Sequence, residues 1–277
     1  MNPCVVIPIY RLPLTREEER SLFSLNEHLA YYPRVIVAPK SFSRQKLLKY
    51  GSMVSLWSDR YFESVETYSR LMLNADFYEQ HTTWSHMLIF QLDCLLFKDE
   101  LLHWCNSPWD YIGAPWFRGF LEKNRNAGLW AVGNGGFSLR KVSSFLKVLR
   151  AGALDGVYRK PYDSPHYGLL PDEGELIDSK RGVYRELLPA WERWPMVGHD
   201  WNVEQEAQRY MYNEDAFWSF EAMKFDPSFK VATVDEGLKF AFEMNPDWCL
   251  KQNGGMLPFG CHAWTRYNRA FWEEIIT

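Results

Sequence analysis

An acidic side chain ends one of the most apolar runs of the chain. Asp93 closes the stretch Ile89-Phe90-Gln91-Leu92-Asp93. A carboxylate at the end of a buried strand is costly to bury unless it meets a metal ion or hydrogen-bond donors. An ordinary interpretation is equally open: Asp93 could be a turn residue, or could cap the helix expected near Asp99. The residues by themselves do not separate a metal ligand from a cap.

A pair of adjacent acids opens a helical pattern in the second half. Glu214 and Asp215 precede a helical run that extends to about Phe225. Neighbouring residues on a helix point ~100° apart, so we expect only one of the two to face a site. That acid could serve as a general base beside a substrate hydroxyl. Alternatively, both could simply complement the helix dipole.

Glycines and a histidine complete the candidate chemistry. Gly133, Gly135 and Gly136 lie where a strand is expected to begin, within the run Val132–Arg140. Glycine at such a place lets another group approach the backbone closely, although a tight turn into a hairpin would also need it. The spacing is not a dinucleotide-binding fingerprint. His262, in the run P-F-G-C-H-A-W, is a single histidine, and such residues are more often structural than ligands.

The order of elements indicates how these residues are positioned. Short apolar runs at 4–10, 34–38, 53–57 and 86–92 alternate with helical patterns after Thr15, over 43–50 and over 64–77. This alternation predicts an α/β fold with a mostly parallel sheet flanked by helices. Ligands of such sheets bind beyond the carboxyl ends of the strands. We expect one domain (1–277), with a loop-rich C-terminal half that includes a long loop at about 154–200.

Composition narrows the class of protein. The 277 residues carry a net charge of −4, which argues against nucleic-acid binding. Five cysteines without a C-x-x-C pattern indicate neither a disulfide framework nor a zinc site. We expect a cytoplasmic protein without signal peptide or transmembrane segment, with peripheral membrane association left open. Aromatic residues make up 17% of the chain, including 13 tryptophans, which supply core and candidate stacking surfaces.

Several sequence blocks together resemble a known family. In chain order they are V-V-I-P-I-Y, Y-S-R-L, F-Q-L-D-C-L, Y-I-G-A-P-W, G-N-G-G-F-S-L-R, N-E-D and P-F-G-C-H-A-W. This set is similar to an uncharacterised family of bacterial, fungal and viral proteins related to nucleotide-sugar glycosyltransferases of the GT-A fold. The resemblance extends from Val5 to Trp264. It implies a GT-A-like, Rossmann-like domain with a nucleotide-binding half (1–105) and an acceptor and catalytic half (106–277).

The resemblance also implies roles for individual residues. Asp215 matches a general base of inverting members, with Glu214 beside it. Asp93 and His262 match the ligands of a Mn²⁺ or Mg²⁺ ion. Gln91 stands where these enzymes have the first acid of their D-x-D motif, so weak metal affinity and metal independence both stay open. The remaining residues are assigned to the nucleotide (Pro8, Tyr10, Arg11, Arg70, Gln91) and to the donor and acceptor sugars (Trp116, Asn134, Gly135, Gly136, Trp194).

The function implied is transfer of a sugar from a UDP-, GDP- or dTDP-linked donor to a glycan, glycolipid or glycoprotein. Inversion is expected from the E-D match alone. A non-catalytic carbohydrate-binding protein that stacks sugars on tryptophan is the alternative, and it would not need Asp93 or Asp215. A metal-dependent hydrolase ranks last, because the seven histidines are scattered without an H-E-x-x-H pattern.

Overall fold

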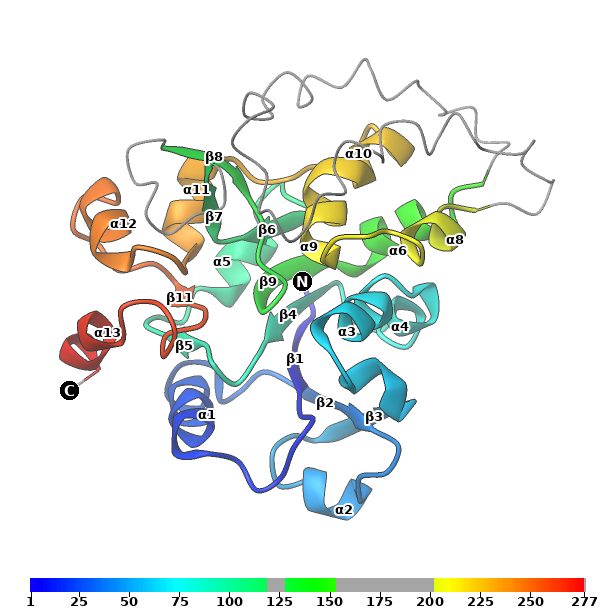
Figure 1. Ribbon diagram of the computed structural model, residues 1–277, viewed down its shortest axis with the longest axis horizontal. Coiled ribbons are helices and arrows are strands. Elements are labelled where there is room, and N and C mark those ends of the chain that lie inside the picture. The colour runs from blue at the N-terminus through cyan, green and yellow to red at the C-terminus, as the bar shows by residue number, and fades with distance from the viewer. Residues whose placement is uncertain (119–127, 153–201, 277) are drawn as a thin grey trace, which may run out of the picture.

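A six-stranded sheet organises the molecule. The computed structural model describes residues 1–118, 128–152 and 202–276. The strand order is β3-β2-β1-β4-β9-β6 (Figure 1). The first four strands in the chain are parallel, and β9 runs antiparallel to both neighbours. The predicted α/β fold with a mostly parallel central sheet is therefore confirmed. The bounds are β1 (Pro3–Pro8), β2 (Arg34–Pro39), β3 (Met53–Trp57), β4 (His86–Phe90), β6 (Tyr111–Gly113) and β9 (Phe137–Lys141).

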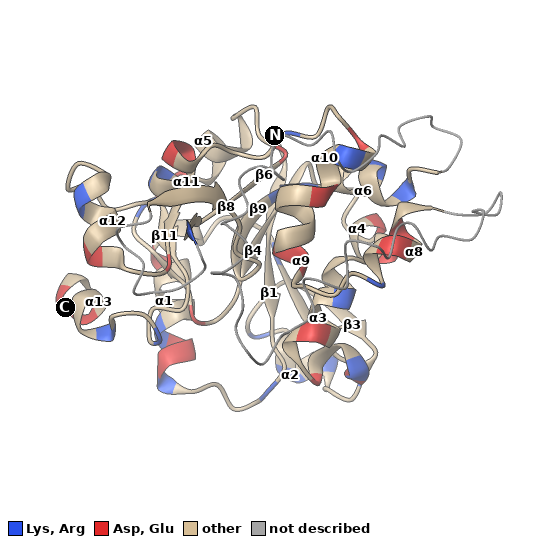
Figure 2. Cartoon of the chain, turned by 45° about the horizontal axis from the view of Figure 1, so that its top comes forward, with Lys and Arg blue, Asp and Glu red and all other residues tan. Residues whose placement is uncertain are grey.

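Helices cover both faces of this sheet. Alternate residues of β1 enter two different cores: Val5 and Ile7 pack towards α1 and α5, whereas Cys4 and Val6 pack towards α3, α4 and α6. Figure 1 shows α1 and α3 on opposite sides of β1. Charged residues lie mainly on the surrounding helices (Figure 2). The first six α-helices described are α1 (Arg16–Leu29), α2 (Arg44–Leu47), α3 (Val65–Met72), α4 (Ala75–Glu79), α5 (Leu101–Cys105) and α6 (Val142–Arg150).

The later part of the chain adds short helices and two small sheets. The helices are α8 (Val203–Ala207), α9 (Glu214–Ala216), α10 (Ala222–Phe225), α11 (Val234–Phe240), α12 (Pro246–Gln252) and α13 (Arg269–Ile275). A π-helical segment, Phe217–Glu221, joins α9 to α10. One small sheet contains β10 (Ala241–Phe242), β11 (Gly260–Cys261) and β5 (Leu95–Leu96). The other pairs β7 (Pro115–Phe117) with β8 (Leu129–Val132).

Local sequence signals set several element boundaries. The Thr15 side chain accepts a hydrogen bond from Glu18 N, and the Glu18 carboxylate accepts one from Thr15 N, so α1 begins with a capping box. The single helix expected over 64–77 is wrong. The Asn74 side chain accepts from two backbone N–H groups and starts a second helix there, because asparagine competes well as a helix cap.

Tryptophan serves mainly as core material among the described residues. Of the ten tryptophans that the structure describes, none is exposed, and five are buried: Trp104, Trp116, Trp218, Trp264 and Trp272.

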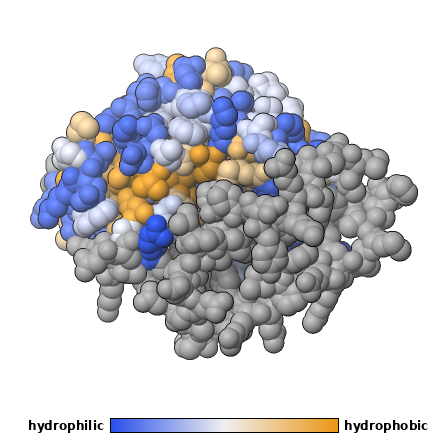
Figure 3. All heavy atoms as spheres, turned by 90° about the horizontal axis from the view of Figure 1, so that it is seen from above, coloured by the Kyte–Doolittle hydropathy of each residue, from blue (hydrophilic) through white to orange (hydrophobic). Residues whose placement is uncertain are grey.

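The long loop expected at about 154–200 lies outside the described residues. The face shown in Figure 3 carries an apolar area bordered by hydrophilic residues. Within the described ranges, every helix is too short or too polar to cross a membrane.

Candidate functional site

A pocket lies beyond the carboxyl ends of β1 and β4. Since β2 and β3 extend the sheet on one side of β1 and β4 on the other, this is the point where the strand order reverses. Open α/β sheets bind ligands at such points. The pocket has a volume of about 360 Å³, and residues from the C-terminal part, Thr265 and Arg269, also line it. It brings together five of the predicted site residues: Pro8, Tyr10, Arg11, Gln91 and Asp93.

The rim of this pocket carries an exposed ring and two paired cations. Tyr10 is 55% exposed, so its ring is accessible to a ligand. The Arg11 guanidinium lies 3.0 Å from the Glu18 carboxylate. Arg269 lies 3.4 Å from Glu17. Both acids belong to the first turn of α1, which thereby orients two guanidinium groups at the pocket.

A candidate cation site adjoins the pocket. The His262 ring nitrogen Nε2 lies 3.3 Å from Asp93 Oδ1 and 3.4 Å from Gln91 Oε1. On its other side, Nδ1 lies 2.9 Å from Glu243 Oε1. Although burial opposes it, the carboxylates of Asp93 and Glu243 raise the pKa of His262 to about 10. Burial likewise opposes ionisation of Asp93, but the charge of His262 holds the Asp93 pKa below its usual value.

The donor chemistry of this site fits a divalent cation. The Asp93 side chain is 43% exposed beside the pocket, and its Oδ1 atom makes the ion pair with His262 Nε2. One carboxylate, one imidazole and one amide oxygen form a set that suits Mn²⁺, with Mg²⁺ favouring the oxygens. Cys94 is close to Asp93 and His262. However, its thiol donates to Gly136 O at 3.3 Å, and burial raises its pKa well above the usual value, so we do not count it as a ligand.

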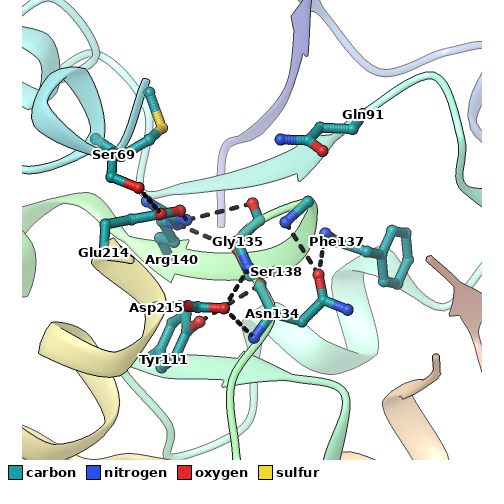
Figure 4. Close-up of polar contacts among 12 residues, drawn as sticks. Ser69, Gln91, Tyr111, Asn134, Gly135, Phe137, Ser138, Arg140, Glu214 and Asp215 are labelled. Carbon is teal, nitrogen blue, oxygen red and sulfur yellow. Dashed lines mark hydrogen bonds and ion pairs between the residues drawn. The ribbon is translucent and has the colours of Figure 1, made fainter. Parts of the chain in front are cut away.

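Asn134 and Gly135 of the turn Asn134–Gly136 lie between Gln91 and the two acids of α9 (Figure 4). A Cβ atom on Gly135 would lie 2.1 Å from Glu214 Oε1, and one on Gly136 would lie 2.1 Å from His262 Nε2. The glycines therefore permit the close approach that the sequence predicts, and the approaching groups are side chains of the chain itself. Asn134, at φ 83°, holds the turn by accepting hydrogen bonds from the N–H groups of Gly136 and Phe137.

Glu214 belongs to a closed network beneath the turn. Its Oε1 lies 3.1 Å from the guanidinium of Arg140, which is fully buried. Its Oε2 accepts a hydrogen bond of 3.0 Å from Ser69. The Arg140 guanidinium also donates to Tyr78, Ser138 and the Gly135 carbonyl. Figure 4 shows this network on the side of the turn opposite Gln91. Glu214 is thus neutralised by a buried arginine.

Asp215 has a different environment. Its Oδ2 accepts hydrogen bonds of 3.2 Å from the N–H groups of Asn134 and Gly135, and its Oδ1 accepts one from Ala216. Burial and the charges of Glu214 and Glu243 nevertheless raise the pKa of Asp215 to about 7. An acid with this pKa can take up a proton near neutral pH. The two acids point in different directions: the Glu214 side chain reaches Arg140, whereas the Asp215 carboxylate meets the backbone of the turn. That only one of them faces a functional site stays a prediction.

Two of the predicted residues that the structure describes, Arg70 and Trp116, lie away from the pocket. The Arg70 guanidinium donates to the carbonyl oxygens of Ala207 and Gln208 and pairs with Glu66, so it ties α3 to α8 and is absent from the described pocket lining. Trp116 is 8% exposed and packs directly against Gly133, which makes it part of the interior. Trp194 lies outside the described residues.

Sequence reasoning missed two charged residues of the site. Arg140 ends the G-N-G-G-F-S-L-R block, and strand alternation from Ser138 could have placed it on the same face. Glu243 gives no comparable signal, because it follows a strand of only two residues. Its position depends on the pairing of β10 with β11, which local sequence does not specify.

The chain belongs to the family described as "Protein of unknown function (DUF5672)", whose family model matches residues 52–262. No curated protein matches. The chain is similar to several solved structures. The apo glycosyltransferase GlyE of Streptococcus pneumoniae TIGR4 is 14% identical, with 99% of this chain and 60% of that protein covered and a TM-score of 0.45. The chain thus spans only part of that relative.

Two further structures cover most of both chains. Mouse xyloside xylosyltransferase 1 is 12% identical over 94% of this chain and 96% of its own, with a TM-score of 0.47. The galactosyltransferase LgtC, in complex with donor and acceptor sugar analogues, is 12% identical over 93% and 86%, with a TM-score of 0.45. At these values the likeness is distant and assigns no activity.

Proposed function

We propose that this chain is a glycosyltransferase that moves a sugar from a nucleotide-sugar donor to a hydroxyl group of a carbohydrate acceptor. One observation carries the proposal: a pocket at the sheet's reversal point adjoins a candidate cation site, and an acid with a pKa of about 7 lies across the Asn134–Gly136 turn. The sequence blocks that resemble GT-A glycosyltransferases support the same assignment.

The donor nucleotide would occupy the pocket. Tyr10 offers a ring face to the base or ribose, and Arg11 offers a cation at the rim. Gln91 and Asp93 at the end of β4 would then lie beside the diphosphate. The N-terminal segment 1–105 supplies most of this pocket, and 106–277 adds Thr265 and Arg269 together with the candidate base. UDP-, GDP- and dTDP-linked donors are the candidates.

Asp93, His262 and Gln91 would hold a Mn²⁺ or Mg²⁺ ion. When bound, such an ion stabilises the negative charge that develops on a diphosphate leaving group. The convergence of Asp93, His262 and Gln91 at the edge of the pocket is the observation that supports this use of the site. Gln91 contributes an oxygen but no charge, so the site holds its cation with a single ligating carboxylate.

The transfer step assigns different roles to the two acids of α9. Asp215 would accept the proton of the acceptor hydroxyl while the hydroxyl oxygen forms a bond to the anomeric carbon. The bond from that carbon to the diphosphate breaks, and its electron pair leaves with the nucleoside diphosphate, which inverts the configuration. Glu214 would act through its charge, since it contributes to the raised pKa of Asp215. Acceptor contacts by Trp194 stay a prediction, and the burial of Trp116 removes its ring from our proposal.

The test is a substitution at Asp215. Purified protein is incubated with a panel of nucleotide sugars and glycan acceptors, and release of nucleoside diphosphate is measured. We expect Asp215→Asn to lower kcat about 10²–10⁴-fold, as loss of a general base does, with nucleotide affinity unchanged. Asp235→Asn, at an exposed position of α11, is the matched control. Wild-type turnover in Asp215→Asn would remove Asp215 as the base.

A further inference from the structure

The small sheet β10-β11-β5 brings three distant segments to one end of the candidate cation site. In the parallel pair β10 and β11, Phe242 lies opposite Cys261, so the next residues, Glu243 and His262, emerge side by side. The His262 N–H group donates to Phe242 O at 3.0 Å and fixes this register. In the antiparallel pair β11 and β5, Cys261 lies opposite Leu95, which brings the end of the Q-x-D segment to His262.

The Glu243 side chain contacts the far side of the His262 ring. Its Oε1 lies 2.9 Å from Nδ1, and both side chains are only 16% exposed. The other ring nitrogen, Nε2, faces Asp93 and Gln91. A carboxylate that accepts a hydrogen bond from one nitrogen of an imidazole fixes the ring orientation and increases the basicity of the other nitrogen.

The His262 ring has little room to change its orientation. Gly136 lies so close to Nε2 that a Cβ atom there would come within 2.1 Å of it. The backbone of the turn and the Glu243 carboxylate therefore hold the imidazole from two directions. The charge of Glu243 also contributes to the raised pKa of Asp215, so the same carboxylate acts on both halves of the site.

We propose that Glu243 is a positioning residue, which accepts a hydrogen bond from His262 Nδ1 and directs Nε2 towards a divalent cation held with Asp93 and Gln91. This inference rests on the cation site of the proposed function. It assigns a role to a residue that none of the sequence blocks contains. It also explains how a site with glutamine in place of one acid retains a strong donor: the second carboxylate acts through the histidine.

The experiment measures Mn²⁺ affinity of the full chain from the electron paramagnetic resonance signal of free Mn²⁺. Loss of a carboxylate that orients a ligating histidine typically weakens metal binding 10–100-fold, so we expect Glu243→Ala to raise the Kd for Mn²⁺ by about that factor. Glu243→Gln keeps an oxygen that can accept from Nδ1, and we expect a Kd between those of wild type and Glu243→Ala. Glu236→Gln, which removes the same charge from a carboxylate paired with Lys239, should leave the Kd unchanged.

The outcomes separate this inference from the function on which it rests. A graded rise in Kd from Glu243→Gln to Glu243→Ala supports the positioning role, and the Gln variant keeps the test valid if the Ala variant fails to fold. Mn²⁺ binding by wild type with the same Kd in both variants overturns the role of Glu243 and leaves the proposed function standing. Absence of Mn²⁺ binding by wild type overturns both the cation site and this inference.

Discussion

Each side of the Asn134–Gly136 turn holds a carboxylate paired with a basic side chain, but one pair is fully buried and the other is partly exposed. On the Gly135 side, Glu214 pairs with the buried guanidinium of Arg140, and its second carboxylate oxygen accepts a hydrogen bond from Ser69. On the Gly136 side, His262 lies between the carboxylates of Asp93 and Glu243, and the Asp93 side chain is 43% exposed beside the pocket. A fully buried network supports the fold, whereas a partly exposed cluster of titratable groups beside a pocket indicates a ligand site.

The largest expected effect concerns the closed side. Replacing Arg140 with methionine leaves the Glu214 carboxylate buried without its partner. Breaking a buried pair in this way costs about 3–5 kcal/mol. We therefore expect Arg140→Met to lower the free energy of unfolding by about that amount in urea titrations. Arg150→Met is the control, because Arg150 pairs with Glu79 at the exposed surface, where a pair contributes about 0–1 kcal/mol. Equal, small effects of both substitutions would contradict the contrast between the two sides.

The second prediction concerns Asp215 and pH. In the folded chain its pKa is about 7, above the usual value of 3.8, so the folded state holds this proton more tightly than the unfolded state does. The stabilisation is present below about pH 4 and is lost as pH rises through 7. Asparagine does not ionise, so Asp215→Asn does not lose stability through deprotonation at this position as the pH rises. We expect the variant to gain stability relative to wild type between pH 4 and 8, by on the order of 2 kcal/mol, after allowance for partial exposure.

Urea titrations of wild type and Asp215→Asn across this pH range measure the difference. Asp235→Asn provides the baseline for an exposed aspartate. A pH-independent difference between Asp215→Asn and wild type would show that Asp215 ionises in the folded chain as it does in an unfolded one.

The parts of the structure that could be predicted from the sequence are those whose signals are local. The apolar runs of β1 to β4 and the capping residues Thr15 and Glu18 carry their structure locally, so these elements are predictable. Asp93 at a strand end was a candidate for the same reason. The contacts of Glu243 depend on the pairing of β10 with β11, and a strand of two residues gives no local pattern that predicts this pairing. The contacts of Arg70 depend on the packing of α3 against α8, which are far apart in the sequence. The division of the expected helix 64–77 at Asn74 could not be predicted from helical periodicity, because it depends on the Asn74 side chain capping a second helix.

The smallest expected effects separate the two glycines. Gly135→Ala places a methyl group against Glu214, and Gly136→Ala places one against His262 Nε2. We expect Gly135→Ala to lower the free energy of unfolding by about 1–3 kcal/mol, as overpacking does, with little change in Mn²⁺ affinity. We expect Gly136→Ala to weaken Mn²⁺ binding, because its methyl group would occupy the space of His262 Nε2 and displace that nitrogen from Asp93 and Gln91. Thermal unfolding and Mn²⁺ titration of both variants measure this. Identical behaviour of the two would contradict the division of the turn.

The central claim is that the pocket and its adjoining cation site bind a nucleoside diphosphate together with a divalent cation. Thermal unfolding with UDP, GDP and dTDP, each with and without Mn²⁺, tests it most directly. We predict that one nucleotide with Mn²⁺ raises the Tm by ~5 °C at a hundredfold excess over its Kd, that Asp93→Ala abolishes this rise, and that the exposed Asp99→Ala retains it. No shift of the wild-type Tm with any nucleotide would contradict the account.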